Sequence, residues 1–414
     1  MTSKRVRYSA FRSFERLITL VALLCLFLSG AWAQNFTVLR DFHNNADARY
    51  PYGALLLESN GNLYGATGGG GAFDYGTVFK INAHRKETIL HSFWGGDGLQ
   101  PWTNLIRDPS GNFYGTTYDG GALEKGQCRH GCGTVFKLDA KGKVTVLHAF
   151  SGGSGGTQPQ DGLVRDKSGN LYGTTTAGGE TSCDYGNGCG MVFRIGRNGK
   201  FTVLHAFSGS QDGARPWTEL IQDTSGSFYG VTEGGGSSGY GTVFKIDSAG
   251  HETVLYSFTG AASGEYPVGQ LARDAAGNLY GATNGGGDSS CYFCGVVFEL
   301  DTAGSETVLH TFTGNPDGAF PYSGVIRDSE GNLYGTTYAG GGSSGCYGLG
   351  CGSVFKADAN GHETVLHGFT GGSDGDISFA PLILDKAGNL YGVAAGGGDQ
   401  TCPGGCGVVF KIKP

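Results

Sequence analysis

Short apolar segments separated by polar turn residues repeat along almost the whole chain. The phrase GNLYG or a close variant occurs seven times and begins at residues 61, 111, 169, 226, 277, 331 and 388. A short apolar segment such as LIRD 105–108 precedes each copy, a Val-Phe segment such as TVFKL 134–138 follows it, and a segment such as TVLHAF 145–150 comes next. These segments are rich in β-branched and aromatic residues and are bounded by Gly, Asp, Asn or Pro, which is typical of β-strands. The pattern predicts four strands in each repeat.

The length of the repeat predicts the fold. Successive GNLYG phrases begin 50 to 58 residues apart, which suits one four-stranded antiparallel sheet per repeat. Seven such sheets arranged radially hide most of their edges, so we predict an all-β protein that forms one seven-bladed β-propeller. A solenoid is the alternative, but four-stranded units with tight turns match blades better than coils.

The order of the strand phrases predicts how the ring closes. The repeats begin with an isolated outer strand, TVLRDF 37–42, and end with the other three strands of a repeat within 382–412. We therefore expect the N-terminal strand to join the C-terminal blade and to complete it.

Residues 1–33 differ from the repeats. Basic residues dominate the first 16 positions, an apolar run extends from Leu17 to Leu28, and Ala31-Trp32-Ala33 has the small-x-small pattern of a cleavage site. The run is shorter than the about 20 residues that a spanning helix needs, so we predict a signal peptide cleaved after Ala33. The remaining chain, 34–414, is then a single propeller domain that is secreted, periplasmic or at the cell surface, with no stable membrane span. An uncleaved anchor is the alternative.

Composition narrows the functional classes. The chain has 79 Gly among 414 residues, yet 39% of its residues are hydrophobic, so it is neither mostly helical nor disordered. Its 29 basic and 36 acidic side chains give a net charge of −7, and no basic surface for nucleic acid is evident. The sequence contains no G-x-S-x-G, HExxH or phosphate-loop motif.

Ten cysteines come in five neighbouring pairs, each between a GNLYG strand and the following Val-Phe strand. The two shortest connections of this kind are the two without cysteine. In an exported protein, partners that occur together in a lengthened loop favour local disulfides. Zinc binding between loops, or a reactive thiol pair at Cys291 and Cys294, is the alternative. The predicted pairs are Cys128–Cys132, Cys183–Cys189, Cys291–Cys294, Cys346–Cys351 and Cys402–Cys406.

The repeated phrases closely resemble those of the GloVer tandem-repeat family of exported bacterial proteins, over nearly the whole chain after residue 33. The resemblance implies a secreted or surface-exposed, propeller-like protein. The order of the phrases is also similar, in general pattern, to that of NHL-type propellers.

Polar residues that break the repeat point to one face of the propeller. Tight Asp-x-x-Gly turns lie on one face, whereas the longer and more variable loops lie on the other, where we expect function. Just before the innermost strands, Asn104, Asp161, Glu219 and Gln270 can converge near the mouth of the channel. Such oxygen-rich groups bind calcium or act as acid and base, and no other cofactor is expected. Solvated polar residues without a ligand are the alternative.

Three tryptophans after residue 33, Trp94, Trp102 and Trp217, all lie in connections between blades. Aromatic faces on loops suit sugar rings and protein partners. Trp94 has small or polar counterparts in the other repeats, which favours ligand contact, whereas the mostly aromatic counterparts of Trp102 and Trp217 favour packing. We therefore predict a binding module for an extracellular glycan or protein. The alternative is a metal-assisted lactonase or lyase with its site at the channel mouth.

Histidines and aspartates also recur on the outer side of the repeat. The histidines occupy one position of the outermost strand, for which we expect packing or exposure to solvent, and the aspartates lie in turns before the next repeat. They are His91, His148, His205, His310 and His367, with Asp47, Asp97, Asp212, Asp317 and Asp374.

Overall fold

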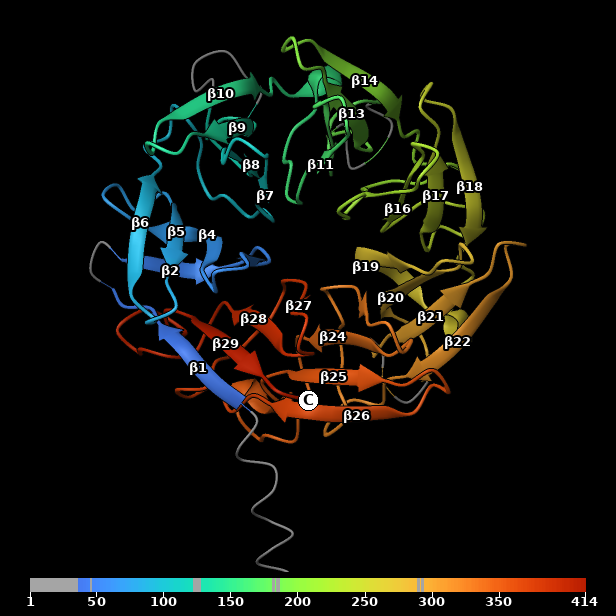
Figure 1. Cartoon of the computed structure of the whole chain (residues 1–414). Coiled ribbons are helices and arrows are strands. Elements are labelled where there is room, and N and C mark those ends of the chain that lie inside the picture. Colours follow the sequence, from blue (N-terminus) through green and yellow to red (C-terminus); the bar gives the residue numbers. More distant parts are fainter. Residues whose placement is uncertain are drawn as a thin grey trace, which may run out of the picture.

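The computed structural model describes residues 36–44, 47–121, 128–180, 183, 187–288, 291 and 294–414. In this part of the chain, seven antiparallel sheets stand around a central axis as the blades of a propeller (Figure 1). The predicted seven-bladed, all-β fold is therefore confirmed. The predicted signal peptide, residues 1–33, lies outside the described residues.

The two inner strands of each blade follow the predicted phrases. The innermost strands are β3 (Leu56–Leu57), β7 (Ile106–Arg107), β11 (Val164–Arg165), β15 (Ile221–Gln222), β19 (Glu265–Arg273), β23 (Ile326–Arg327) and β27 (Ile383–Leu384). The GNLYG strands are β4 (Leu63–Gly70), β8 (Phe113–Thr117), β12 (Leu171–Thr175), β16 (Phe228–Thr232), β20 (Leu279–Gly285), β24 (Leu333–Thr337) and β28 (Leu390–Ala394).

The two outer strands complete each blade. The Val-Phe strands are β5 (Thr77–Ile81), β9 (Thr134–Leu138), β13 (Met191–Ile195), β17 (Thr242–Ile246), β21 (Val296–Leu300), β25 (Ser353–Ala357) and β29 (Val408–Ile412). The outermost strands are β1 (Phe36–Asp41), β6 (Glu87–Ser92), β10 (Val144–Ala149), β14 (Phe201–Ala206), β18 (Glu252–Ser257), β22 (Glu306–Thr311) and β26 (Glu363–Gly368).

We number the blades in chain order from blade 1, which contains β3 to β6, to blade 7, which contains β27 to β29. Blade 1 has an additional strand, β2 (Ala48–Pro51), which pairs with β4. Three short 3-10 helices are described in the connections: η1 (Gly153–Gly155), η3 (Ala261–Ser263) and η4 (Cys346–Gly348).

The N-terminal strand closes the ring as predicted. β1 pairs antiparallel with β29, and Phe36 lies opposite Ile412. Figure 1 shows β1, in blue, beside the red strands of blade 7.

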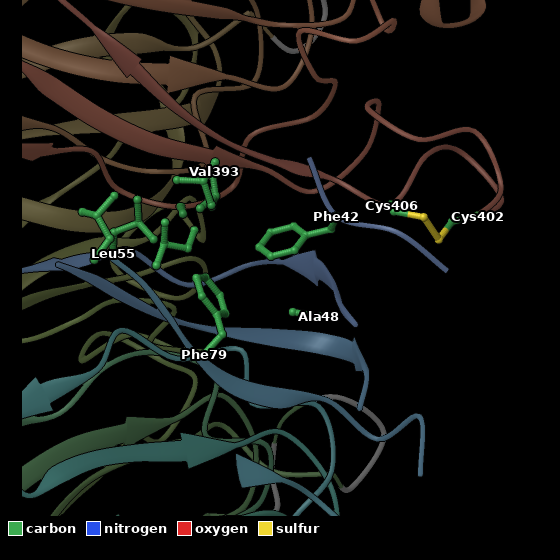
Figure 2. Packing of buried hydrophobic residues seen from close by; sticks show 11 residues of the cluster. Phe42, Ala48, Leu55, Phe79, Val393, Cys402 and Cys406 are labelled. Atoms are coloured by element: carbon green, nitrogen blue, oxygen red, sulfur yellow. A yellow bond between two sulfur atoms is a disulfide. The ribbon is translucent and has the colours of Figure 1, made fainter. Parts of the chain in front are cut away.

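The hydrophobic core is divided among the junctions between blades. At each junction, the Phe of a Val-Phe strand meets the Phe that follows the outermost strand of the preceding blade, with ring centroids 5.1 to 5.5 Å apart in edge-to-face orientation. Figure 2 shows Phe42 and Phe79 side by side where blade 7 meets blade 1. The closing junction is thus packed like the others.

Glycine in the LYG phrase makes room for these phenylalanines. A Cβ atom on Gly392, for example, would lie 2.4 Å from the ring of Phe410 on the neighbouring strand. Because such contacts are sterically forbidden, the phrase keeps Gly where a strand would otherwise carry a larger residue.

Five disulfides join the cysteine pairs in the order predicted from their spacing. They are Cys128–Cys132, Cys183–Cys189, Cys291–Cys294, Cys346–Cys351 and Cys402–Cys406. All of them lie in connections on the face with the longer loops, which we call the loop face. The opposite face, with the tight Asp-x-x-Gly turns, is the turn face.

Candidate functional site

A cavity of about 490 Å³ lies on the loop face where the blades meet around the axis. We call it the vestibule. Residues that precede the innermost strands form most of its wall, together with Tyr118, which directly follows the GNLYG strand β8. Its lining consists of Tyr52, Trp102, Asn104, Tyr118, Gln160, Asp161, Trp217, Phe379 and Pro381.

Aromatic side chains form an open chain of ring contacts along the vestibule, which we call the collar. It runs from Trp217 through Tyr322, Phe379, Tyr52 and Trp102 to Tyr118, and successive ring centroids are 4.6 to 6.0 Å apart. Tyr338 packs beside Phe379 at 5.6 Å. The rings come from five blades, so the collar exists only in the folded propeller.

Trp102 is held in the collar by one stacked ring and one glycine. Its ring stacks on Tyr118 at 4.6 Å, and a Cβ atom on Gly68 would lie only 2.5 Å from its indole nitrogen. That nitrogen, Nε1, has no hydrogen-bond partner among the described residues. Trp102 therefore presents a fixed aromatic surface at the cavity wall.

Side chains from two non-adjacent blades meet at the floor of the vestibule. The Asn104 amide of blade 2 donates a hydrogen bond to Glu219 of blade 4, and its oxygen accepts one from the backbone N–H of Ala54. Blade 3, which lies between them, has Gly162 at the same repeat position. A Cβ atom there would lie 2.8 Å from the Glu219 carboxyl carbon and 2.9 Å from Asn104 Cβ, so glycine makes this contact possible.

The two carboxyl groups at the floor hold protons more strongly than usual. Burial raises the pKa of Asp161 to about 7, and the nearby Glu219 adds to the rise. Burial also raises the pKa of Glu219 to about 7, although its hydrogen bond from Asn104 opposes the rise. Oδ2 of Asp161 has no hydrogen-bond partner among the described residues. Near neutral pH the pair can both donate and accept a proton, as acid–base chemistry requires.

A second cavity, of about 830 Å³, occupies the channel on the turn-face side of this floor. Asn104 borders both cavities, whereas Glu219 and Gln270 border the second one. Apolar residues of the innermost strands of blades 1 and 7, such as Leu57 and Leu384, form much of its wall. The two ends of the channel thus differ in chemistry.

The residues around the floor are a poor fit for calcium. Calcium takes six to eight oxygen ligands. The predicted group supplies two carboxyl groups, the amide of Gln270 and the amide of Asn104, and the last is already bonded at both of its ends.

The structure brings four of the six predicted binding residues to the vestibule lining: Trp102, Trp217, Asn104 and Asp161. Glu219 joins them through Asn104. Trp94 lies outside the lining, and 58% of its surface is exposed. Tyr75 lies against the neighbouring Gly95, and Phe73 and Tyr75 are also strongly exposed. Trp94 thus belongs to a separate aromatic area on the rim of blade 1.

The aromatic counterparts of Trp102 and Trp217 were expected to pack, but their meeting in one collar was not predicted. A usable signal existed, because the residue after the Pro (Ser378 in blade 7) that precedes each innermost strand is aromatic in five blades. These residues are Tyr52, Trp102, Trp217, Tyr322 and Phe379. The role of Gly162 carried no such signal, since glycine is common throughout this chain.

Comparisons with known proteins agree with the architecture. A family model described as the Gloeobacter/Verrucomicrobia repeat matches residues 26–128, 125–347 and 292–414. A search of curated proteins found no match. No helix among the described residues is long and apolar enough to span a membrane.

Several solved structures share the fold at low sequence identity. A virginiamycin B lyase from Staphylococcus aureus has a TM-score of 0.57 and 12% identity, and the match covers 92% of this chain and 99% of the lyase chain. An extracellular domain assigned to a hybrid two-component system of B. thetaiotaomicron has a TM-score of 0.58 and 10% identity, over 92% of this chain and 40% of the other. A protein assigned as a 6-phosphogluconolactonase from Bacteroides uniformis has a TM-score of 0.51 and 13% identity, over 80% and 88%.

Proposed function

The chain belongs to the Gloeobacter/Verrucomicrobia repeat family, and from that premise we propose that it is an extracellular binding module that holds the end of a glycan in the vestibule. The observation that carries the proposal is the collar: a chain of contacting aromatic rings along a cavity with amide and carboxyl groups at its floor.

The chemistry of the lining suits a sugar. Aromatic faces pack against the C–H faces of sugar rings, while amide and carboxyl groups bond hydroxyls. Gln160, Asn104 and Asp161 offer such groups, and the cavity volume of about 490 Å³ lies within the range of small-ligand sites. A protein partner would need a broader surface, such as the exposed aromatic area around Trp94.

An extracellular location agrees with the cysteine chemistry. Disulfides persist in oxidising compartments, and five are present among the described residues. The extracellular propeller from B. thetaiotaomicron shows that this architecture is used outside cells.

Acid–base catalysis is the second candidate function, because Asp161 and Glu219 both have pKa values of about 7 and lie close together. In a lyase or lactonase reaction, the protonated member would donate to a leaving oxygen and the ionised member would accept a proton. Structural neighbours named as a lyase and as a lactonase make these reaction classes the first to assay.

Binding is tested by screening the purified protein on a glycan array and by calorimetry with the best ligand. Trp217→Ala and Trp102→Ala are expected to weaken binding at least about tenfold, while circular dichroism shows that the β-sheet fold is kept. Trp94→Ala is the matched variant on the rim. Full affinity in both collar variants would overturn the proposal, and loss in Trp94→Ala alone would move the contact to the rim.

Catalysis is tested on the same ligands and on sugar lactones by product analysis. Turnover by the wild type that Glu219→Gln abolishes, while leaving binding intact, supports the second candidate. Binding of the ligand without turnover supports the glycan-binding function and not catalysis.

A further inference from the structure

A second repeated set of polar residues lies on the outer side of the propeller, at the junctions between blades. Every outermost strand has a β-bulge, such as the one between Val38 and Arg40 in β1. The bulge lets consecutive residues face the same neighbouring blade. Leu39 packs into the core cluster that contains Phe79 of blade 1, and Arg40 binds Glu87 of the same blade.

The fifth residue of each outermost strand therefore faces the first residue of the next outermost strand. The residue types at these two facing positions differ from junction to junction. His148 stacks on Phe201 with ring centroids 3.9 Å apart, whereas Tyr256 donates a hydrogen bond of 3.4 Å to Glu306. Comparing the junctions shows which interaction each residue pair makes between neighbouring blades.

Where blade 7 meets blade 1, two carboxylates hold a positive charge. Arg40 Nε donates to Glu87 at 2.6 Å, and its guanidinium also binds Asp47. The side chain of Glu87 is only 5% exposed, so its charge needs a partner inside the protein. Arg40 supplies that partner.

The junction between blade 5 and blade 6 has carboxylates at the same two positions, but it has no arginine between them. Asp317 and Glu363 occupy the positions of Asp47 and Glu87, and His310 stands in place of Arg40. Nε2 of His310 lies 3.2 Å from Asp317 Oδ1, and one ligand atom from each of the three residues lies within 4.8 Å of the others. Oε1 of Glu363 is buried and has no hydrogen-bond partner among the described residues.

The geometry points to a divalent cation of the zinc class bound by His310 Nε2, Asp317 Oδ1 and Glu363 Oε1, in the position that the Arg40 guanidinium takes at the closing junction. One imidazole and two carboxylates are ligands that zinc uses, with a water molecule as the fourth. The cation replaces the charge of the missing arginine and ties blade 5 to blade 6.

The surroundings prepare the ligands for this role. The other oxygen of Asp317, Oδ2, accepts hydrogen bonds from the backbone N–H of Thr313 at 2.9 Å and from its hydroxyl at 3.1 Å. These bonds leave Oδ1 directed at His310 and fix the carboxylate, as outer contacts do at metal sites. His310 and Asp317 are 17% and 14% exposed, so an ion can reach them. Tetrahedral zinc needs ligand atoms about 3.4 Å apart. His310 Nε2 and Asp317 Oδ1 are already 3.2 Å apart, so zinc binding requires the Glu363 carboxyl group to move toward them.

Other junctions supply matched controls within the same chain. Glu306 has the position of Glu363 but faces Tyr256, so it has no imidazole beside it. His91 pairs with Asp97 at 2.7 Å, but Val144 stands where the glutamate would be. The junction of His205, Asp212 and Glu252 repeats the three residue types. We expect it to bind zinc more weakly, because its three ligand atoms do not all lie within 4.8 Å of one another as those of the His310 group do.

The experiment uses untagged, chelator-treated protein titrated with zinc alone. Bound metal is measured by elemental analysis after gel filtration, and melting temperature is recorded with zinc and with chelator. Glu363→Gln is expected to remove about one equivalent of bound zinc and the zinc-dependent rise in melting temperature, whereas Glu306→Gln changes neither. The Glu363→Gln variant can still bind zinc at the His205 junction. The double variant Glu363→Gln, Glu252→Gln is expected to lose that zinc as well.

A second variant, in which an arginine replaces the histidine, tests the site even if removal of the Glu363 carboxylate perturbs folding. His310→Arg recreates the arrangement of Arg40 and is expected to raise the melting temperature in chelator and abolish its response to zinc. Zinc uptake that is absent from the wild type, or unchanged in both Glu363→Gln and His310→Arg, would overturn the site.

Discussion

The turn face and the loop face are built from the same repeat but use it differently. On the turn face, each tight turn has an acid that accepts a hydrogen bond from the tyrosine hydroxyl six residues later, in every blade. On the loop face, the position just before each predicted innermost phrase is not constant, and in blade 5 it lies inside β19. The residues there are Ala54, Asn104, Gly162, Glu219, Gln270, Gly324 and Pro381.

The two faces differ because the interaction partner of a side chain comes from the same blade on the turn face and from a different blade near the axis. A turn acid and its tyrosine belong to one blade, so each blade has to supply both. Near the axis, side chains from different blades compete for one space, and Asn104 reaches Glu219 only because Gly162 has no side chain between them. Interactions across the axis therefore require a broken repeat.

Removing a turn acid is expected to have the largest effect. Asp223 accepts hydrogen bonds from Ser225, Ser227 and the Tyr229 hydroxyl, so Asp223→Ala should lower the free energy of unfolding by about 3 kcal/mol in denaturant titrations. Affinity at the vestibule should not change. Asp301→Ala, in an exposed turn with backbone partners only, is the control and should cost about 1 kcal/mol.

Removing a disulfide should affect loop-face stability without affecting binding. The double variant Cys402→Ala, Cys406→Ala should lose about 2 kcal/mol of unfolding free energy, because the bridge closes a short loop. Neither cysteine lines the vestibule. A change in ligand affinity measured by calorimetry would show that the loop positions the collar.

Gly162→Ala tests the broken repeat directly. The added methyl group should separate Asn104 from Glu219 and weaken ligand binding about tenfold, which is about 1.4 kcal/mol. Gly234→Ala is the matched control, since the nearest atom to its Cβ would be 3.6 Å away. Equal affinities in the two variants would contradict the role given to Gly162.

The two faces should also respond to pH in opposite directions. Partial burial raises the pKa of Asp223, but hydrogen bonds outweigh this effect and lower the pKa from 3.8 to about 2. Its contribution to stability is present above pH 3.8 and is lost as pH falls through 2. Burial raises the pKa of Glu219 from 4.5 to about 7, so its contribution is present below pH 4.5 and is lost as pH rises through 7.

Melting temperatures measured from pH 2 to pH 8 in matched variants separate these contributions. Asp223→Asn should flatten only the acid end of the curve. Glu219→Gln should flatten only the neutral end, by about 2–4 °C, because part of the residue faces the channel. An unchanged neutral end in Glu219→Gln would show that this carboxyl group is ionised throughout.

Features formed within a repeat could be predicted from the sequence. Between distant blades, ring closure and the convergence of Asn104 with Glu219 were expected, but the individual side-chain contacts were not. Strands, turns and disulfides depend on neighbours in the chain. The partner of β29 could be predicted because the last repeat has only three strands and the isolated TVLRDF segment supplies the fourth. The collar contact between Tyr52 and Phe379 and the pairing of Asn104 with Glu219 depend on the angles between blades, which no local pattern encodes.

The outer histidines illustrate the same limit. Their repetition predicted packing or exposure to solvent, and His148 does pack on Phe201. His310 instead faces Asp317 and Glu363, because the first residue of the next outermost strand decides its environment. That residue lies about one blade further along the chain, beyond the reach of a local motif.

The pairing of β1 with β29 joins the two ends of the described chain in one blade. Strands of blades 1 to 6 are neighbours in sequence and can pair as soon as they are synthesised, whereas blade 7 needs both Phe36 and Ile412. Until β1 docks, β29 has a free edge, and free edges recruit strands from other molecules. We therefore expect ring closure to be a late step of folding, and misassembly before it to increase with protein concentration.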